Sequence, residues 1–91
     1  MIVLDTSGLY AAFDRSEPRH SAAVAAIRAA RPPLLLSPLV LAEMDYLLLS
    51  RLGPDAEMTF VEDVARGAYR LEALSTDDVA ACAAIVRRHA D

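Results

Sequence analysis

The chain has 91 residues, a length that suits one small domain and leaves no room for a second hydrophobic core. Hydrophobic residues make up 55% of it and aromatic residues only 5%, so leucine, valine, isoleucine and alanine must build the core. The net charge of −4 argues against binding nucleic acid by overall charge, although a bound metal ion could supply local positive charge.

The first half of the chain predicts two strands and three helices. Residues 1–4 are a short apolar run that predicts a buried strand ending at Asp5, and 9–13 predict a short helix. An Ala-rich helix is expected from about Arg19 to the prolines at 32–33. Its apolar face should contain His20, Val24, Ile27 and Arg31. Leu34 to Leu36 predict the second strand, and Ser37-Pro38 has the form of an N-cap and first residue of a helix.

That third helix should run to about Leu52 and be deeply buried, because it is apolar almost all round. A fourth helix is predicted from Asp55 to Gly67, and its expected core stripe is Met58, Val61 and Ala65. Residues 69–74 alternate apolar and charged side chains, as in an edge strand. Residues 75–78 have the capping-box form before a last helix that reaches the C-terminus.

The order β-α-α-β-α-α-β-α predicts an α/β fold with one parallel sheet flanked by helices. Residues 1–91 are expected to form one domain that is truncated at its C-terminus, because three strands and a helix leave the sheet open to another strand. The single cysteine, Cys82, fits a reducing compartment, and the sequence shows no signal peptide or membrane span. We therefore expect a soluble, cytoplasmic protein.

Asp5 stands where an apolar strand meets a turn. Ligands of open α/β sheets gather outside the carboxyl ends of the strands, so Asp5 is well placed for a binding site. Aspartate also commonly caps a helix, and here one begins nearby. Position alone leaves both interpretations open.

Glu43 is the more unusual acid, because it lies within the apolar helix. The residues that share its face at helical spacing are Leu39, Val40, Tyr46 and Leu47. A carboxylate buried there requires a cation, a proton or a hydrogen-bonding partner. The sequence therefore predicts either a metal ligand or an ion pair with a buried arginine, whereas Asp45 projects from another side and should be exposed.

Asp5 and Glu43, considered together, predict a metal site. The helix that carries Glu43 follows the second strand directly, so both acids are expected at the carboxyl edge of the sheet. Two converging carboxylates would repel each other unless a divalent cation lay between them. Ligands that offer only oxygen favour Mg²⁺ or Mn²⁺.

Two segments resemble the N-terminal signatures of PIN-domain ribonucleases. They are Leu4 to Leu9 (LDTSGL) after an apolar strand and Ser37 to Glu43 (SPLVLAE) at the start of the long helix. Residues 73–78 (ALSTDD) are similar to the matching stretch of VapC toxins. The resemblance covers the whole chain in order and spacing.

The resemblance implies a Mg²⁺- or Mn²⁺-dependent endoribonuclease toxin of a toxin–antitoxin pair. PIN domains hold the metal with three or four acids, and a metal-bound water attacks the phosphodiester. Asp5 would be the first of these catalytic, metal-binding acids and Glu43 the second, with Thr6 or Ser7 in support. The family further implies an RNA substrate, a VapB-like antitoxin and a homodimer. Single-stranded RNA is expected, because unstacked strands reach a compact site more easily.

The third and fourth acids of the family would lie beyond the helix that ends this chain, and Asp91 falls short of the third. Little nuclease activity is therefore expected of the chain as written, since two carboxylates bind Mg²⁺ weakly. The alternative function is a catalytically incompetent PIN-like module that binds an antitoxin or itself. A phospho-receiver domain does not fit, because the early acid pair and the later lysine are missing.

The other candidate residues have simpler structural roles. His20 lies on an apolar face, His89 has no ligand-spaced partner, and Cys82 lies in an Ala-rich helix. Arg15 and Arg19 flank the first inter-helix loop. In the family an antitoxin packs across the early helices. The residues that would form its groove, or more simply the core, are Leu9, Tyr10 and Phe13.

Overall fold

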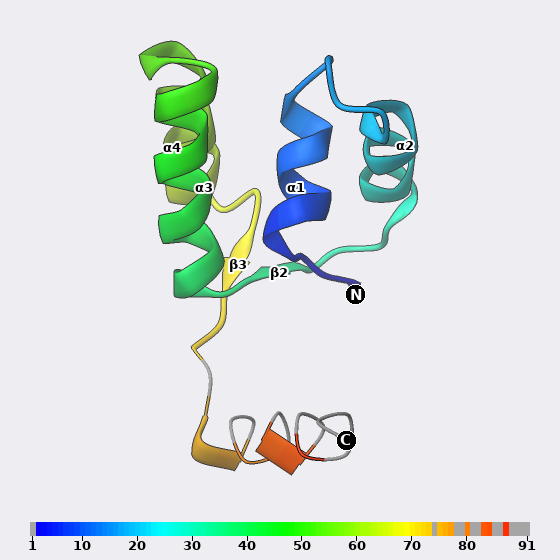
Figure 1. Cartoon of the computed structure of the whole chain (residues 1–91). Coiled ribbons are helices and arrows are strands. Elements are labelled where there is room, and N and C mark those ends of the chain that lie inside the picture. The colour runs from blue at the N-terminus through cyan, green and yellow to red at the C-terminus, as the bar shows by residue number, and fades with distance from the viewer. Residues whose placement is uncertain (1, 74, 78–79, 81–82, 85–86, 88–91) are drawn as a thin grey trace.

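The computed structural model describes residues 2–73, 75–77, 80, 83–84 and 87. Its elements are β1 (Ile2–Val3), α1 (Thr6–Phe13), α2 (His20–Ala29), β2 (Leu34–Leu36), α3 (Pro38–Arg51), α4 (Pro54–Ala65) and β3 (Arg70–Leu71). The strands form one parallel sheet in the order β1-β2-β3, and these helices stand on one side of it (Figure 1). The predicted α/β fold and its element order are thus confirmed as far as β3. The last predicted helix lies mainly outside the described residues.

The parallel pairing of β1 with β2 places the carboxyl ends of the two strands side by side. Each strand is followed by a residue that caps the next helix. The Gly8 backbone N–H donates to Asp5 Oδ1 at 2.8 Å, and the Val40 backbone N–H donates to Ser37 Oγ at 3.1 Å. These bonds satisfy backbone donors that the first helical turn leaves free. The start of α1 and the start of α3 are therefore fixed above the same edge of the sheet.

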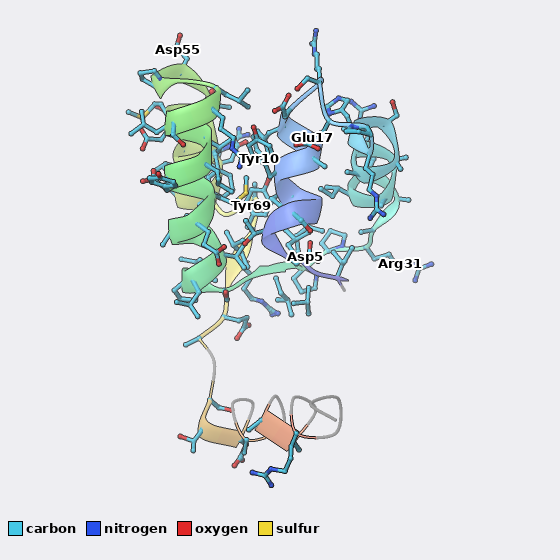
Figure 2. All side chains as sticks on the ribbon, viewed as in Figure 1. Asp5, Tyr10, Glu17, Arg31, Asp55 and Tyr69 are labelled. Atoms are coloured by element: carbon cyan, nitrogen blue, oxygen red, sulfur yellow. The ribbon has the colours of Figure 1, made fainter. Side chains whose placement is uncertain are left out.

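The core lies between the sheet and helices α1, α3 and α4. Its largest fully buried side chains are Phe60, Leu9, Leu36, Met44 and Leu48. The Phe60 ring makes edge-to-face contacts with Phe13 at 5.6 Å and with Tyr69 at 5.7 Å between ring centroids. Figure 2 shows Tyr10 and Tyr69 between α1 and α4. Aromatic contacts therefore join the first helix, the fourth helix and the segment before β3.

The inward faces of α3 and α4 differ from the predicted ones. On α3, Leu39 is 66% and Tyr46 70% exposed, so the helix is not buried all round. On α4, Phe60 faces the core while Met58 and Val61 of the predicted stripe are exposed. A helix that is apolar on every side carries little periodic signal, so its sequence does not show which side points inward.

The third strand is shorter than the predicted segment 69–74, and Leu71, an apolar residue of the alternating pattern, is 47% exposed. Among the described strands, β3 lies at one edge of the sheet, as predicted. Within the described residues, no helix combines the length and the apolar composition needed to cross a bilayer.

Candidate functional site

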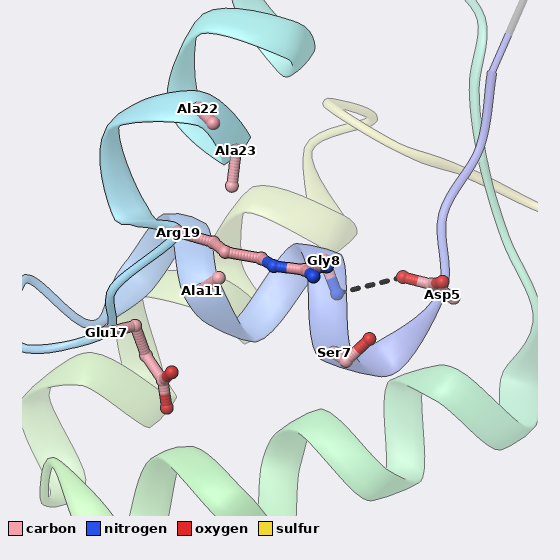
Figure 3. Close-up of a pocket in the computed structure, with 8 residues that line it drawn as sticks. All are labelled: Asp5, Ser7, Gly8, Ala11, Glu17, Arg19, Ala22 and Ala23. Atoms are coloured by element: carbon pink, nitrogen blue, oxygen red, sulfur yellow. Dashed lines mark hydrogen bonds between the residues drawn. The ribbon is translucent and has the colours of Figure 1, made fainter.

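Asp5 lies at the end of α1 that meets the sheet and borders a cavity of about 380 Å³ between α1 and α2 (Figures 2 and 3). The residues that line the cavity are Asp5, Ser7, Gly8, Ala11, Glu17, Arg19, Ala22 and Ala23. Half of them are glycine or alanine, which leaves the cavity open along α1 and α2. The polar side-chain groups that the described residues contribute are a hydroxyl, two carboxylates and one guanidinium.

The capping role considered for Asp5 is confirmed, and it leaves room for a second one. Only Oδ1 of the carboxylate takes part in the cap, and Oδ2 has no hydrogen-bond donor among the described residues. A carboxylate can accept about four hydrogen bonds, so one cap bond uses a small part of its capacity. The cap therefore holds Asp5 in place while its second oxygen stays available to a ligand.

Glu43 is exposed, and the prediction that it shares a buried face with core residues was wrong. The core side of α3 carries Met44 and Leu48, whereas Leu39 and Tyr46, about one turn on either side of Glu43, point outward. On the other side of Glu43, Val40 and Leu47 are partly buried against the core, so Glu43 lies on the flank of α3, between its core side and its outward side. The residues that line a second cavity, of about 340 Å³, are Ala42, Glu43, Tyr46 and Leu47.

The arginine partner considered for Glu43 is not formed within the described part of the chain. The ion pairs there join Arg66 to Asp63 at 2.6 Å and Arg70 to Glu72 at 3.4 Å. The same part of the chain contains no group of three or more histidine, cysteine, aspartate or glutamate side chains placed to hold a metal ion. The candidate site therefore contains two carboxylates. Asp5 is the cap residue between β1 and α1, and Glu43 lies in α3, the helix that follows the neighbouring strand β2.

These donors fit a hard divalent cation. Mg²⁺ is commonly bound in proteins through one or two carboxylates, with waters and substrate phosphates as its other ligands. Asp5 and Glu43 are exposed carboxylates, so an ion can reach both of them from solvent. Among the described residues, no histidine or cysteine lines either cavity, and such a set of oxygen ligands favours Mg²⁺ or Mn²⁺ over Zn²⁺.

A polar network at the other end of α1 holds this helix on α3. The Tyr10 hydroxyl donates to Asp14 Oδ2 at 2.6 Å, and the Arg51 guanidinium lies 5.2 Å from the centre of the Tyr10 ring. Hydrogen bonds from Ser16 and Tyr10 lower the pKa of Asp14, whereas burial, with the bond to Asp14, raises the pKa of Tyr10. Tyr10 is therefore a core residue that anchors the helix bearing the candidate ligand.

His20 has the structural role expected of it. Its Nδ1 lies 2.8 Å from the carbonyl oxygen of Ala11, a contact that joins the start of α2 to α1. Leu9 is likewise part of the core. Cys82, His89 and Asp91 lie outside the described residues.

Glu17 and Arg19 were not predicted as site residues. A signal was present in the sequence, because two helices joined by a short polar loop pack antiparallel. A long side chain at the start of the second helix can then extend back along the first. The sequence could not show that the Arg19 side chain takes this direction.

Comparison with known proteins gives a consistent result. The PIN domain model matches residues 2–90. The chain is 38% identical over 90 residues to Ribonuclease VapC26 of Mycobacterium tuberculosis (strain ATCC 25618 / H37Rv), a match that covers 99% of this chain and 67% of that protein. It also matches the crystal structure of Mycobacterium tuberculosis VapC20, described as a Sarcin-Ricin loop cleaving toxin. That match has a TM-score of 0.77 and 26% identity, and covers 98% of this chain and 68% of VapC20. The chain therefore belongs to the PIN-domain family, within its VapC group.

Proposed function

We propose that the protein is a Mg²⁺- or Mn²⁺-dependent endoribonuclease toxin in which Asp5 and Glu43 bind the metal ion. The observation that carries the proposal is the position of Asp5, fixed by its cap bond at the carboxyl end of β1 with its second oxygen free beside a cavity. The relatives support it, since VapC26 is named a ribonuclease and VapC20 is described as a Sarcin-Ricin loop cleaving toxin.

Each residue would contribute in a defined way. The bond from the Gly8 backbone N–H orients the Asp5 carboxylate, and Glu43 offers an exposed carboxylate from α3. When bound, the cation would activate water and offset negative charge on the scissile phosphate. The cavity beside Asp5 would receive the RNA strand. Single-stranded RNA suits it better than a duplex, because unstacked phosphates reach a compact site more easily.

The wider biological setting follows from the family. We propose a VapB-like antitoxin as the partner, a homodimer as the assembled form and the cytoplasm as the location. Residues 1–91 would form a single PIN-like domain, and the chain spans 67% and 68% of the lengths of the two relatives.

A second candidate function is a PIN-like module that has lost catalysis and binds an antitoxin or itself. One observation favours it: no group of three or more metal-binding side chains occurs in the described part of the chain. This module would neither cleave RNA nor show a change in melting temperature (Tm) on addition of Mn²⁺.

Substitutions at Asp5 test the proposed function. Asn caps helices well, so Asp5→Asn should keep the Tm of the metal-free chain while abolishing the Mn²⁺-dependent rise in Tm and reducing RNA cleavage to background. Asp5→Ala also loses the cap and should cost about 1 kcal/mol of stability. Thermal melts with and without Mn²⁺, together with gel assays of RNA cleavage, separate the two effects.

Glu43→Gln should abolish the Mn²⁺-dependent rise in Tm, together with any RNA cleavage, without lowering the Tm of the metal-free chain, because the side chain is exposed. Glu62→Gln, at an exposed glutamate on α4, is the matched control and should keep activity. Undiminished cleavage by Glu43→Gln would reject its assigned role. A Tm of the unsubstituted chain that does not change on addition of Mn²⁺ would favour the non-catalytic module.

A further inference from the structure

The cavity beside Asp5 contains a cationic side chain for which the proposed metal site gives no role. Arg19 begins near Glu17, and its guanidinium extends along α1 toward Gly8 and Asp5 (Figure 3). The other lining residues beneath and beside it are small: Ala11, Ala22 and Ala23. A flexible chain such as a nucleic-acid backbone could therefore approach the guanidinium without displacing a bulky group.

The Arg19 side chain has no internal partner in the part of the chain that the structure describes. The ion pairs there join Arg66 to Asp63 and Arg70 to Glu72. A guanidinium presents five N–H donors in a planar fork that matches the oxygens of a phosphate. The geometry of the cavity therefore leaves these donors available to an anionic ligand.

The fold itself gives no reason for an arginine at this position. Arg19 is the N-cap of α2, and its side chain makes no capping hydrogen bond. Ser, Thr, Asp and Asn are the residues that cap helices well, and a cation at a helix N-terminus opposes the helix dipole. Local conflicts of this kind between sequence and structure are expected at functional positions.

Charge determines when the cavity can attract an anion. Among the described residues that line the cavity, two are acidic, Asp5 and Glu17, and one is basic, Arg19, so their formal charges sum to −1. A divalent cation at Asp5 would reverse that sign. Phosphate binding in this cavity should therefore require both the cation and the guanidinium.

We propose that Arg19 binds a backbone phosphate of the RNA next to the cation site at Asp5. This inference rests on the proposed function, because it takes RNA as the ligand and Asp5 as the metal-binding residue. Arg19 would be a substrate-binding residue that fixes the position of the strand. RNA is favoured over an acidic segment of a partner protein, because Arg19 and Asp5 line the same cavity. In the proposed function, the phosphodiester that is cleaved lies at the metal ion bound by Asp5.

The test measures the binding of a short, fluorescently labelled single-stranded RNA by anisotropy. Ca²⁺, which also takes oxygen ligands, replaces Mg²⁺ and Mn²⁺, and a gel verifies that the RNA stays intact. Arg19→Asn removes the guanidinium and supplies a good N-cap, so the Tm should stay equal or rise. The RNA affinity should fall about tenfold, and the slope of its salt dependence should decrease by about one.

Arg28→Asn is the matched control, since Arg28 is an exposed arginine of the same helix that does not line the cavity. It changes the net charge equally and should leave RNA affinity close to that of the unsubstituted chain. Equal losses of RNA affinity in both variants would show that only the overall charge matters, and would overturn the proposal. A lower Tm for Arg19→Asn would instead assign Arg19 to the fold.

Two further outcomes separate this inference from the proposed function. If Asp5→Asn loses Ca²⁺-dependent RNA binding while Arg19→Asn keeps it, the phosphate role is wrong and the metal site stands. If the unsubstituted chain binds no RNA in Ca²⁺, both proposals fail. Retained RNA binding by Arg19→Asn with lost binding of an acidic partner peptide would assign Arg19 to a protein partner.

Discussion

Asp5 and Gly8 lie so close together that residue 8 has no room for a side chain. A Cβ on Gly8 would lie 2.7 Å from Asp5 Oδ1, well inside van der Waals contact. The Asp5 carboxylate would have to shift, and its hydrogen bond to the Gly8 backbone N–H would be weakened or lost. The absence of a side chain at position 8 therefore fixes where the candidate metal ligand sits.

Gly8→Ala should consequently change metal binding more than stability. Loss of the cap costs about 1 kcal/mol, and alanine is favoured over glycine inside a helix by up to about 1 kcal/mol, so the two nearly cancel. We expect a small change in Tm, with the Mn²⁺-dependent rise in Tm shifted to higher Mn²⁺ concentration. Ala12→Gly in the same helix is the control and should lower Tm without altering the Mn²⁺ response. An unaltered Mn²⁺ response of Gly8→Ala would show that the Asp5 position does not matter.

The candidate residues differ in how far their sequence context could place them. Asp5 was predictable, because a strand end and a helix start are local features and both determine its position. The burial of Glu43 was not, since it depends on which side of α3 meets the rest of the molecule. Arg19 was predicted only as a loop-flanking residue, because the direction of a long side chain depends on the packing of α2 against α1.

At the scale of elements, α4 illustrates the same difficulty. The predicted core stripe was Met58, Val61 and Ala65, yet Phe60 is fully buried and Val64 packs against the core. Both stripes have helical spacing, so periodicity alone could not choose between them. The larger apolar area of a phenylalanine was the signal that favoured the correct face.

Phe60→Ala should therefore destabilise the protein by about 3 to 5 kcal/mol, because it removes a fully buried ring together with its contacts to Phe13 and Tyr69. Met58→Ala is the control on the same helix. Met58 is 56% exposed, so its substitution should change stability by no more than about 0.5 kcal/mol. Urea unfolding followed by circular dichroism gives both values. Equal losses of stability in the two variants would contradict the structure, in which Phe60 rather than Met58 faces the core.

The contact between α3 and α4 also includes two acids, Asp45 and Glu57. A hydrogen bond with the Asp45 carboxyl, followed by desolvation and by repulsion from its charge, raises the pKa of Glu57. The folded state thus holds the Glu57 proton more tightly than the unfolded chain does. The resulting stabilisation is complete below the unfolded-state pKa and is lost as the pH rises through the raised folded-state pKa.

Asp45→Asn should accordingly raise the Tm at neutral pH, since it removes the repulsion, and the gain should shrink as the pH falls toward about 4. Asp55→Asn is an informative control. Asp55 lies in the first turn of α4, where a negative charge favours the helix dipole, so its loss should lower the Tm at neutral pH. Thermal melts between neutral pH and about pH 4 measure the change in Tm of both variants. A Tm gain for Asp45→Asn that does not depend on pH would contradict the carboxyl–carboxyl contact.

At the scale of the whole molecule, the order of elements was predictable because each element has local signals at its ends. Ser37 and Pro38 mark the start of α3, and Gly53 and Pro54 separate it from α4. The parallel sheet follows from that order, since helices must connect its strands. The surface left outside the core was not predictable, because it depends on how the helices are rotated against each other.

That surface includes an apolar face on α3, opposite Met44 and Leu48. Its large hydrophobic residues are Leu39, Tyr46 and Leu49, which are 66%, 70% and 47% exposed. Contiguous apolar surface on a small protein favours association. We therefore expect concentration-dependent self-association through this face, in line with the proposed homodimer.

Sedimentation velocity should show Tyr46→Lys as mainly monomeric, with a dissociation constant raised about tenfold or more. Met58→Lys places the same charge on an exposed apolar position of α4 and should associate like the unsubstituted chain. If both variants associate equally, the α3 face is not the contact between copies.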